Sequence, residues 1–320
     1  MKFYLDKNIF KGLHYYINQS KSKPINKCII KPPSIIKKNK NRIIVIGDIH
    51  GDFNALLYSL YKAKVINTYG KWIGKKTIVV QLGDQIDKGG RGIHIDNDDS
   101  TEELKIIEFM HDLHFKAIKH NGAVYNLIGN HELMNVLGDF RYVTNNHLYG
   151  FGGPDTRKLL FKPGGVLSQK LACNTNGIIQ IGNWIFVHAG LLPSHVENYT
   201  IDGINTLVRN ILLGNLKINE LSLNDYNLIF GKDSLFWNRE YSMYNNCKKL
   251  NKTLNILNIN NNGGMVVGHT IQNTIHSICN NKLWMTDVGM STAFGQKQNK
   301  TERIEVLEII NDGEIVHKII

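Results

Sequence analysis

The chain has 320 residues, enough for one large domain or two smaller ones. Apolar residues make up 42% of the chain and charged residues 20%, the proportions of a folded globular protein rather than a disordered one. No apolar run is long enough to cross a bilayer, so we predict no membrane segment. The formal net charge of +11 favours acidic partners such as phosphate groups or nucleic acid, without choosing between them.

Residues 1–41 are predicted to form a basic N-terminal extension. Residues 1–40 hold ten lysines and one acidic residue, Asp6, and the run from Lys31 to Pro33 is typical of an extended, solvated arm. A solvated leader is favoured over an arm that binds nucleic acid, although nucleic acid remains a possible partner. Aromatic residues in this stretch suggest a short helix that lies on the main domain. Residues 42–320 are predicted to form that domain.

The four cysteines are scattered along the chain without the CxxC spacing of a metal knuckle. They are Cys28, Cys173, Cys247 and Cys279. We therefore expect neither a zinc knuckle nor a disulfide framework. A reducing compartment, and with it a cytoplasmic location, is the expectation that follows.

The first predicted strand, Ile43–Ile46, is an unbroken run of β-branched residues, as in a fully buried strand. It stops at Gly47, and Asp48 and His50 follow at once. A carboxylate and an imidazole at the carboxyl end of such a strand can point at one ligand, since α/β sheets bind ligands there. Taken alone, the pair could also be a turn carboxylate beside a surface imidazole.

The same arrangement recurs at two later strands. A predicted strand at 77–82 is followed by Gly83 and Asp84, and one at 123–128 is followed by Gly129 and Asn130. Helical patterns separate these strands, so a mainly parallel sheet covered by helices is predicted. The polar tips of the three strands would then converge at one edge of that sheet.

Two further predicted strands end in histidine. The strand at 184–187 leads into His188, and the strand at 265–267 leads into Gly268 and His269. Carboxylate, amide and imidazole donors without a thiolate suit divalent Mn, Fe or Zn. The ordered set GDxHGD, GDxxD, GNHE, HAG and GHT predicts a binuclear metal site.

This set of motifs resembles that of the calcineurin-like metallophosphoesterases, and within them the phosphoprotein phosphatases. Five segments resemble more narrowly the Shewanella-like phosphatases: Gly129–Asn135, Gly138–Val143, Phe161–Gly165, Phe236–Tyr241 and Asp287–Ser291. The resemblance covers residues 42 to about 294. It implies an α/β metallophosphoesterase fold with two central β-sheets flanked by helices and an active site at the strand carboxyl ends. We also predict a C-terminal hairpin, with strands at 303–309 and 314–319.

The resemblance implies a binding site for two divalent metal ions. One ion would be held by Asp48, His50 and a bridging Asp84. The other would be held by Asp84, Asn130, His188 and His269. Two such ions can lower the pKa of a shared water, which would attack phosphorus, and can hold the phosphoryl oxygens.

His131 is the predicted general acid, because it follows the ligand Asn130 and is not needed for metal. Asp87 would fix its tautomer and favour its charged form. The alternative for His131 is a structural hydrogen bond at a turn between strand and helix.

The residues that would hold the substrate phosphate depart from the pattern of eukaryotic Ser/Thr phosphatases. Their usual Asp-Arg-Gly is replaced here by Asp87, Lys88 and Gly89. Lysine is a point charge and cannot make the two-point contact of a guanidinium with phosphate. Either Lys88 serves with looser geometry or Arg91 replaces it. Arg141 and Arg239 are further candidates, and an ion pair that supports the domain is the alternative for each arginine.

These expectations define a metal-dependent phosphomonoesterase, with phosphoproteins as the expected substrate. Small phosphoesters or dinucleoside polyphosphates are the alternative substrates. A different class of protein, a non-catalytic binder of nucleic acid or phosphate, is carried as a second hypothesis. Residues 201–233 match no motif and are a candidate helical cap beside the active site.

Overall fold

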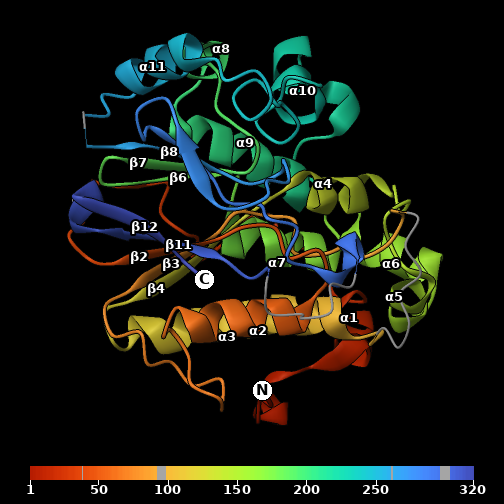
Figure 1. The fold of residues 1–320 in the computed structure, drawn as a ribbon. Coiled ribbons are helices and arrows are strands. Elements are labelled where there is room, and N and C mark those ends of the chain that lie inside the picture. Colours follow the sequence, from red (N-terminus) through yellow and green to blue (C-terminus); the bar gives the residue numbers. More distant parts are fainter. Residues whose placement is uncertain (38, 92–98, 261, 296–302) are drawn as a thin grey trace.

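The computed structural model describes residues 1–37, 39–91, 99–260, 262–295 and 303–320. Two six-stranded sheets lie at the centre, and helices cover the outer face of each (Figure 1). The expected fold class, two central sheets flanked by helices, is confirmed. Within the described residues, no helix combines the length and apolar character needed to cross a bilayer.

One sheet, here called sheet B, contains the first three predicted strands. Its order is β12-β11-β2-β3-β4-β5. Strands β2 (Ile43–Ile46), β3 (Ile78–Gln81), β4 (Ala123–Leu127) and β5 (Thr175–Asn176) are parallel, so their carboxyl ends share one edge. Helix α2 (Phe53–Lys62) connects β2 to β3, and α3 (Glu102–Ile118) connects β3 to β4. The Asp52 carboxylate caps α2 by accepting from the backbone N–H of Ala55.

The far edge of sheet B is the predicted C-terminal hairpin. Strand β11 (Val306–Ile310) pairs antiparallel with both β2 and β12 (Ile315–Ile319). The turn between them, residues 311–313, has positive φ at all three positions, which is why asparagine, aspartate and glycine occupy it.

The other sheet, sheet A, has the order β1-β6-β7-β8-β10-β9. Its strands are β1 (Ile35–Ile36), β6 (Ile178–Ile181), β7 (Trp184–Val187), β8 (Gly264–Val267), β10 (Leu283–Met285) and β9 (His276–Ile278). Side chains alternate along β7: Trp184 and Phe186 pack with sheet B in the inner core, while Ile185 and Val187 pack with the outer helices. This alternation explains why every residue of β7 is buried.

The later α-helices come after β4 in the chain. They are α4 (Asn130–Leu137), α5 (Asn145–Gly150), α6 (Pro154–Phe161), α7 (Val166–Asn174), α8 (Pro193–Asn198), α9 (Ile201–Leu213), α10 (Leu223–Phe230) and α11 (Cys247–Ile256). The helical character predicted for residues 201–233 is confirmed, and α9 packs on α7 and β6.

The N-terminal segment packs on the body of the protein in two places. Helix α1 (Gly12–Gln19) lies against α3, α6 and α7 and buries Tyr16, which confirms the short helix expected there. Further along, β1 pairs in parallel with β6 and so extends sheet A. A separate extension over residues 1–41 stays a prediction.

All four cysteines are paired, so the expectation of no disulfide framework was wrong. Cys28 is bonded to Cys173 and Cys247 to Cys279, across 145 and 32 residues of sequence. Spacing along the chain carried no sign of these pairs because each joins segments that only the tertiary fold brings together. The inference of a reducing compartment loses its basis, and a cytoplasmic location stays a prediction.

The Cys28–Cys173 disulfide should contribute strongly to stability. It ties the N-terminal segment to α7 and closes a long loop, so Cys173→Ser should lower the free energy of unfolding by about 2–5 kcal/mol. Urea unfolding of the variant and of reduced wild type checks this. Titration of four free thiols in the folded wild type would contradict the pairing.

Candidate metal centre

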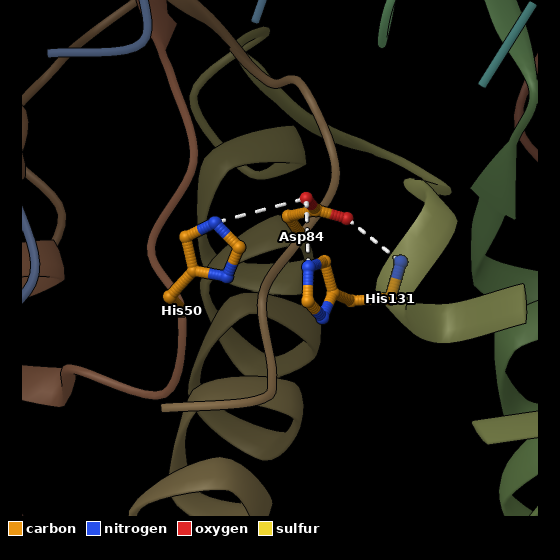
Figure 2. A group of neighbouring side chains, drawn as sticks. All are labelled: His50, Asp84 and His131. Carbon is orange, nitrogen blue, oxygen red and sulfur yellow. Dashed lines mark hydrogen bonds and ion pairs between the residues drawn. The ribbon is translucent and has the colours of Figure 1, made fainter. Parts of the chain in front are cut away.

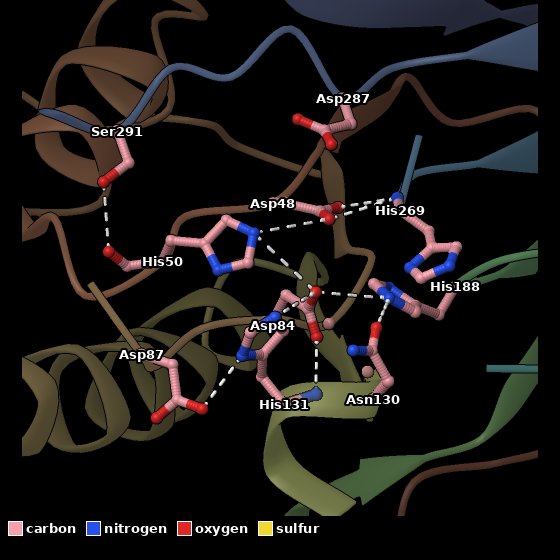
Figure 3. Close-up of polar contacts among 12 residues, drawn as sticks. Asp48, His50, Asp84, Asp87, Asn130, His131, His188, His269, Asp287 and Ser291 are labelled. Atoms are coloured by element: carbon pink, nitrogen blue, oxygen red, sulfur yellow. Dashed lines mark hydrogen bonds and ion pairs between the residues drawn. The ribbon is translucent and has the colours of Figure 1, made fainter. Parts of the chain in front are cut away.

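The polar tips of five strands meet at one place between the two sheets, as the sequence predicted (Figure 3). Sheet B supplies Asp48 and His50 after β2, Asp84 after β3, and Asn130 and His131 at the start of α4; sheet A supplies His188 after β7 and His269 after β8. All of them except Asp48 and His188 line a cavity of about 670 Å³. Asp48 and His188 are almost fully buried behind its wall.

One group of possible metal donors consists of His50, Asp84 and His131 (Figure 2). Their donor atoms all lie within 4.8 Å of one another. The Nε2 atom of His50 is 3.7 Å from Asp84 Oδ2 and 3.9 Å from Asp48 Oδ2. This spacing leaves room for an ion that contacts several donors at once.

A second group consists of Asp84, His188 and His269, again within 4.8 Å. His188 Nε2 lies 3.4 Å from Asp84 Oδ2 and 2.9 Å from Asn130 Oδ1. Its Nδ1 lies 2.8 Å from the backbone carbonyl of Leu82, a contact that fixes the ring with Nε2 facing the donors. Asp84 belongs to both groups, so one carboxylate is shared by the two sets of possible donors.

The electrostatics of the donors suit cation binding. Burial would raise the pKa of Asp84, but the imidazoles of His188, His131 and His50 hold it well below its usual range. Burial and neighbouring cationic groups keep the pKa of His50 and His269 well below the ordinary value. His188 differs: burial would lower its pKa, but Asp84 and Asp48 raise it to about 10. Metal ligates neutral imidazole and ionised carboxylate, so His188 would release a proton when a divalent ion binds to this donor set.

Four residues of the site have an unfavourable backbone conformation. His50, Asp84, Asp87 and His269 all have φ between 43° and 71°, a region that non-glycine residues seldom occupy. Each such residue costs on the order of 1–3 kcal/mol, and strain of this kind gathers at functional sites. At Gly129 a Cβ would lie 2.1 Å from Asp84 Oδ1, so only glycine lets the two turns approach.

Glu132 holds these two turns together, a role that the sequence analysis missed. Its carboxylate accepts hydrogen bonds from the backbone N–H groups of Gly129, Asp84 and Gln85 at 2.7, 2.9 and 2.8 Å. The GNHE motif contained the residue, but the pattern did not show which backbone groups it would reach.

His131 and Asp87 are brought together as predicted. His131 Nδ1 lies 2.9 Å from Asp87 Oδ2. Burial would lower the pKa of His131, but Asp84 and Asp87 raise it above the ordinary value. The ring therefore has Nδ1 fixed and Nε2 on the side of Asp84, 3.9 Å from its Oδ2.

The predicted phosphate-binding residues separate into two pairs. Arg91 and Arg239 line the cavity, whereas Lys88 and Arg141 are not among the described residues that do so. Lys88 is buried and its ammonium pairs with Glu102, and the exposed Arg141 pairs with Asp139. No residue of 201–233 is among the described lining residues, so the expected cap does not reach the cavity.

Arg91 is held in place by aromatic rings and backbone carbonyls. Its guanidinium lies 5.2 Å from the ring centre of Tyr142 and 4.7 Å from that of Phe294. It also donates to the carbonyls of Asp87 and Gly89. Its Nη2 also lies 2.9 Å from His50 Nδ1, so Arg91 contacts one of the possible metal donors. A planar cation held in this way beside the cavity is pre-organised for a phosphate oxygen. A third arginine, Arg303, lines the cavity and was not anticipated.

Residues 41–273 match the calcineurin-like phosphoesterase family, and the chain belongs to that family. Membership makes it a phosphoester hydrolase and implies divalent metal ions. Among its relatives, Shewanella-like protein phosphatase 2 of Arabidopsis thaliana is 30% identical over 85% of this chain and 76% of that protein. Shewanella-like protein phosphatase 1 of Plasmodium berghei is 31% identical over 81% of this chain and 70% of that protein. The resemblance drawn from the motifs is confirmed.

A solved structure with the same fold is that of the cold-active protein-tyrosine phosphatase of a psychrophilic Shewanella. It superposes with a TM-score of 0.71 at 24% identity, covering 91% of this chain and 83% of that one. This likeness supports the fold.

Proposed function

We propose that the chain is a binuclear-metal protein phosphatase that removes phosphate from phosphoproteins. The observation that carries the proposal is the position of Asp84, which belongs to two donor groups beside a cavity that also presents His131, Arg91 and Arg239. The curated relatives named above are protein phosphatases and match most of this chain, which supports the substrate class.

Two divalent ions, Mn, Fe or Zn, would be held by these donors. Asp48, His50 and Asp84 would take one ion, and Asp84, Asn130, His188 and His269 the other. When bound, such a pair lowers the pKa of a water and offsets charge on the phosphoryl oxygens.

The residues of the chain have separate tasks around that chemistry. Arg91 and Arg239 bind the phosphate oxygens, because both reach the cavity and both are anchored by other hydrogen bonds. His131 gives the proton on Nε2 to the leaving oxygen, and Asp87 keeps Nδ1 protonated. Tyr142, Trp237 and Phe294 supply apolar faces for the side chain that carries the phosphate.

The first experiment is hydrolysis of an aryl phosphate and of phosphopeptides by the purified protein loaded with Mn, Fe or Zn. Turnover that disappears on chelation and favours phosphopeptides over a dinucleoside polyphosphate supports the proposal. A preference for the dinucleoside polyphosphate would assign a metabolite as substrate. Metal binding without hydrolysis, together with salt-sensitive binding of nucleic acid, would favour the non-catalytic binder.

Arg91 should matter to phosphate binding more than Arg141. A charge-assisted hydrogen bond is worth about 1.5–3 kcal/mol, so Arg91→Ala should lower kcat/KM by roughly 10- to 100-fold. Arg141→Ala should stay within about threefold of wild type, since its side chain is exposed and paired outside the cavity. Initial rates on one phosphopeptide compare the two, and equal losses would contradict the assignment.

A further inference from the structure

We propose that Arg157 is a positioning residue that, through Asp87, orients His131 for proton transfer. The inference rests on the proposed function, since it concerns the acid that the phosphatase reaction needs. Arg157 lies on α6 and follows none of the strands that carry the metal donors.

The Arg157 guanidinium is fully buried and divides its donors among three side chains. It donates to Asp87 Oδ1 at 3.3 Å, to Glu103 Oε2 at 2.6 Å and to Asn135 Oδ1 at 2.7 Å. These partners come from the loop after β3, from α3 and from α4. One cation therefore joins three elements at the position of Asp87.

Two side chains that contact Arg157, those of Asn135 and Glu103, also hold Asp87 in place. Asn135 donates its amide to Asp87 Oδ1 and Oδ2 at 2.9 and 3.0 Å, and Glu103 Oε1 accepts from the Asp87 backbone N–H at 2.8 Å. Asp87 has a φ of 71°, so its backbone needs such support. With Oδ1 held by Arg157 and Asn135, Oδ2 is directed at Nδ1 of His131.

The guanidinium is also confined by aromatic rings. Its carbon lies 4.4, 5.2 and 5.7 Å from the ring centres of Phe151, Phe161 and Phe140. A planar cation with several directed donors suits this enclosure, and a lysine ammonium would keep the charge but not the three directed contacts. The arrangement fixes the direction of the Asp87 carboxylate, and so the ring plane of His131.

A purely structural role predicts a different outcome from a positioning role. A structural ion pair would change stability alone, whereas a group that acts through the acid changes how the rate depends on the leaving group. Good leaving groups need little protonation, and poor ones need it most. The slope of log kcat against leaving-group pKa therefore distinguishes the two roles.

The test measures kcat and KM of Mn-loaded wild type, Arg157→Met and Arg157→Lys on a series of aryl and alkyl phosphates. We expect kcat of Arg157→Met to fall about 10- to 100-fold for alkyl phosphates and about threefold or less for the most acidic phenol. KM and metal content should stay at the wild-type values, and Arg157→Lys should give an intermediate slope. If Arg157→Met does not fold, Arg157→Lys carries the same comparison, because it retains a cation between the two carboxylates.

A double variant and a matched control complete the design. Arg157→Met should add little to the loss already caused by His131→Ala, since both act through one group. Arg209 on α9 is the control: it is buried and bonds to the Ala172 carbonyl and to Asn176 Oδ1, apart from the cavity. Arg209→Met should lower the unfolding midpoint and leave the leaving-group slope unchanged.

The outcomes separate this inference from the proposed function. A wild type that hydrolyses no phosphoester with any metal would overturn both. An active wild type whose Arg157 variants keep the wild-type slope, or lose activity multiplicatively with His131→Ala, would overturn the inference alone.

Discussion

Asp84→Asn should reduce phosphoester hydrolysis by at least about 10³-fold, the equivalent of several kcal/mol of transition-state stabilisation. The substitution keeps the size of the side chain and removes its charge. Asp84 is the one donor common to both groups, and its carboxylate faces three imidazoles. Losing that charge weakens both metal positions at once.

The measurement is kcat/KM on an aryl phosphate together with the metal content per chain. Asp112→Asn is a matched control, because Asp112 pairs with Lys116 on the surface of α3 and is not among the described lining residues. Asp84→Asn that retains both ions and more than a tenth of the activity would contradict a bridging role.

His131→Ala should slow hydrolysis by about 10²- to 10⁴-fold for substrates with poor leaving groups. The reason is that Nε2 of His131 lies near the carboxylate of Asp84, a possible metal donor, while its Nδ1 contacts the carboxylate of Asp87. The loss should shrink as the leaving group becomes more acidic, because such groups depart without a proton.

The control for this variant is His195→Ala, which removes a buried histidine that contacts the backbone of Leu192 and Asp233. Metal analysis gives the decisive comparison. His131 lies within the donor group of His50 and Asp84, so loss of an ion together with an unchanged leaving-group slope would assign His131 as a ligand instead.

The convergence of the candidate metal donors could be predicted because a parallel sheet places the carboxyl ends of its strands at one edge. Asp48, Asp84 and Asn130 each follow a glycine at such an end, and the pairing of β2, β3 and β4 brings them together. The histidines after β7 and β8 face the same point, since the two sheets pack on each other.

The contacts that hold the site residues in place could not be predicted in the same way. Arg157 is 70 residues from Asp87, and only the packing of α6 against α4 brings it there. Lys88 has the charge and the motif position expected of a phosphate-binding residue. Its ammonium nevertheless pairs with Glu102 at the start of α3. The cysteine pairs were missed for the same reason. Local sequence patterns indicate where strands end and turns occur. Contacts between residues far apart in the sequence depend on how the helices pack in the tertiary structure.

Strand β11 has a consequence for how the protein is made. It pairs with β2, whose end carries Asp48 and His50, although some 260 residues separate the two in the sequence (Ile309 pairs with Ile43). During synthesis on the ribosome, β2 therefore keeps one row of backbone N–H and C=O groups unpaired until residues 306–310 emerge. An unpaired edge of this kind invites association with other chains. Until β11 emerges, the nascent chain thus carries β2, the strand that leads into Asp48 and His50, as an unpaired sheet edge.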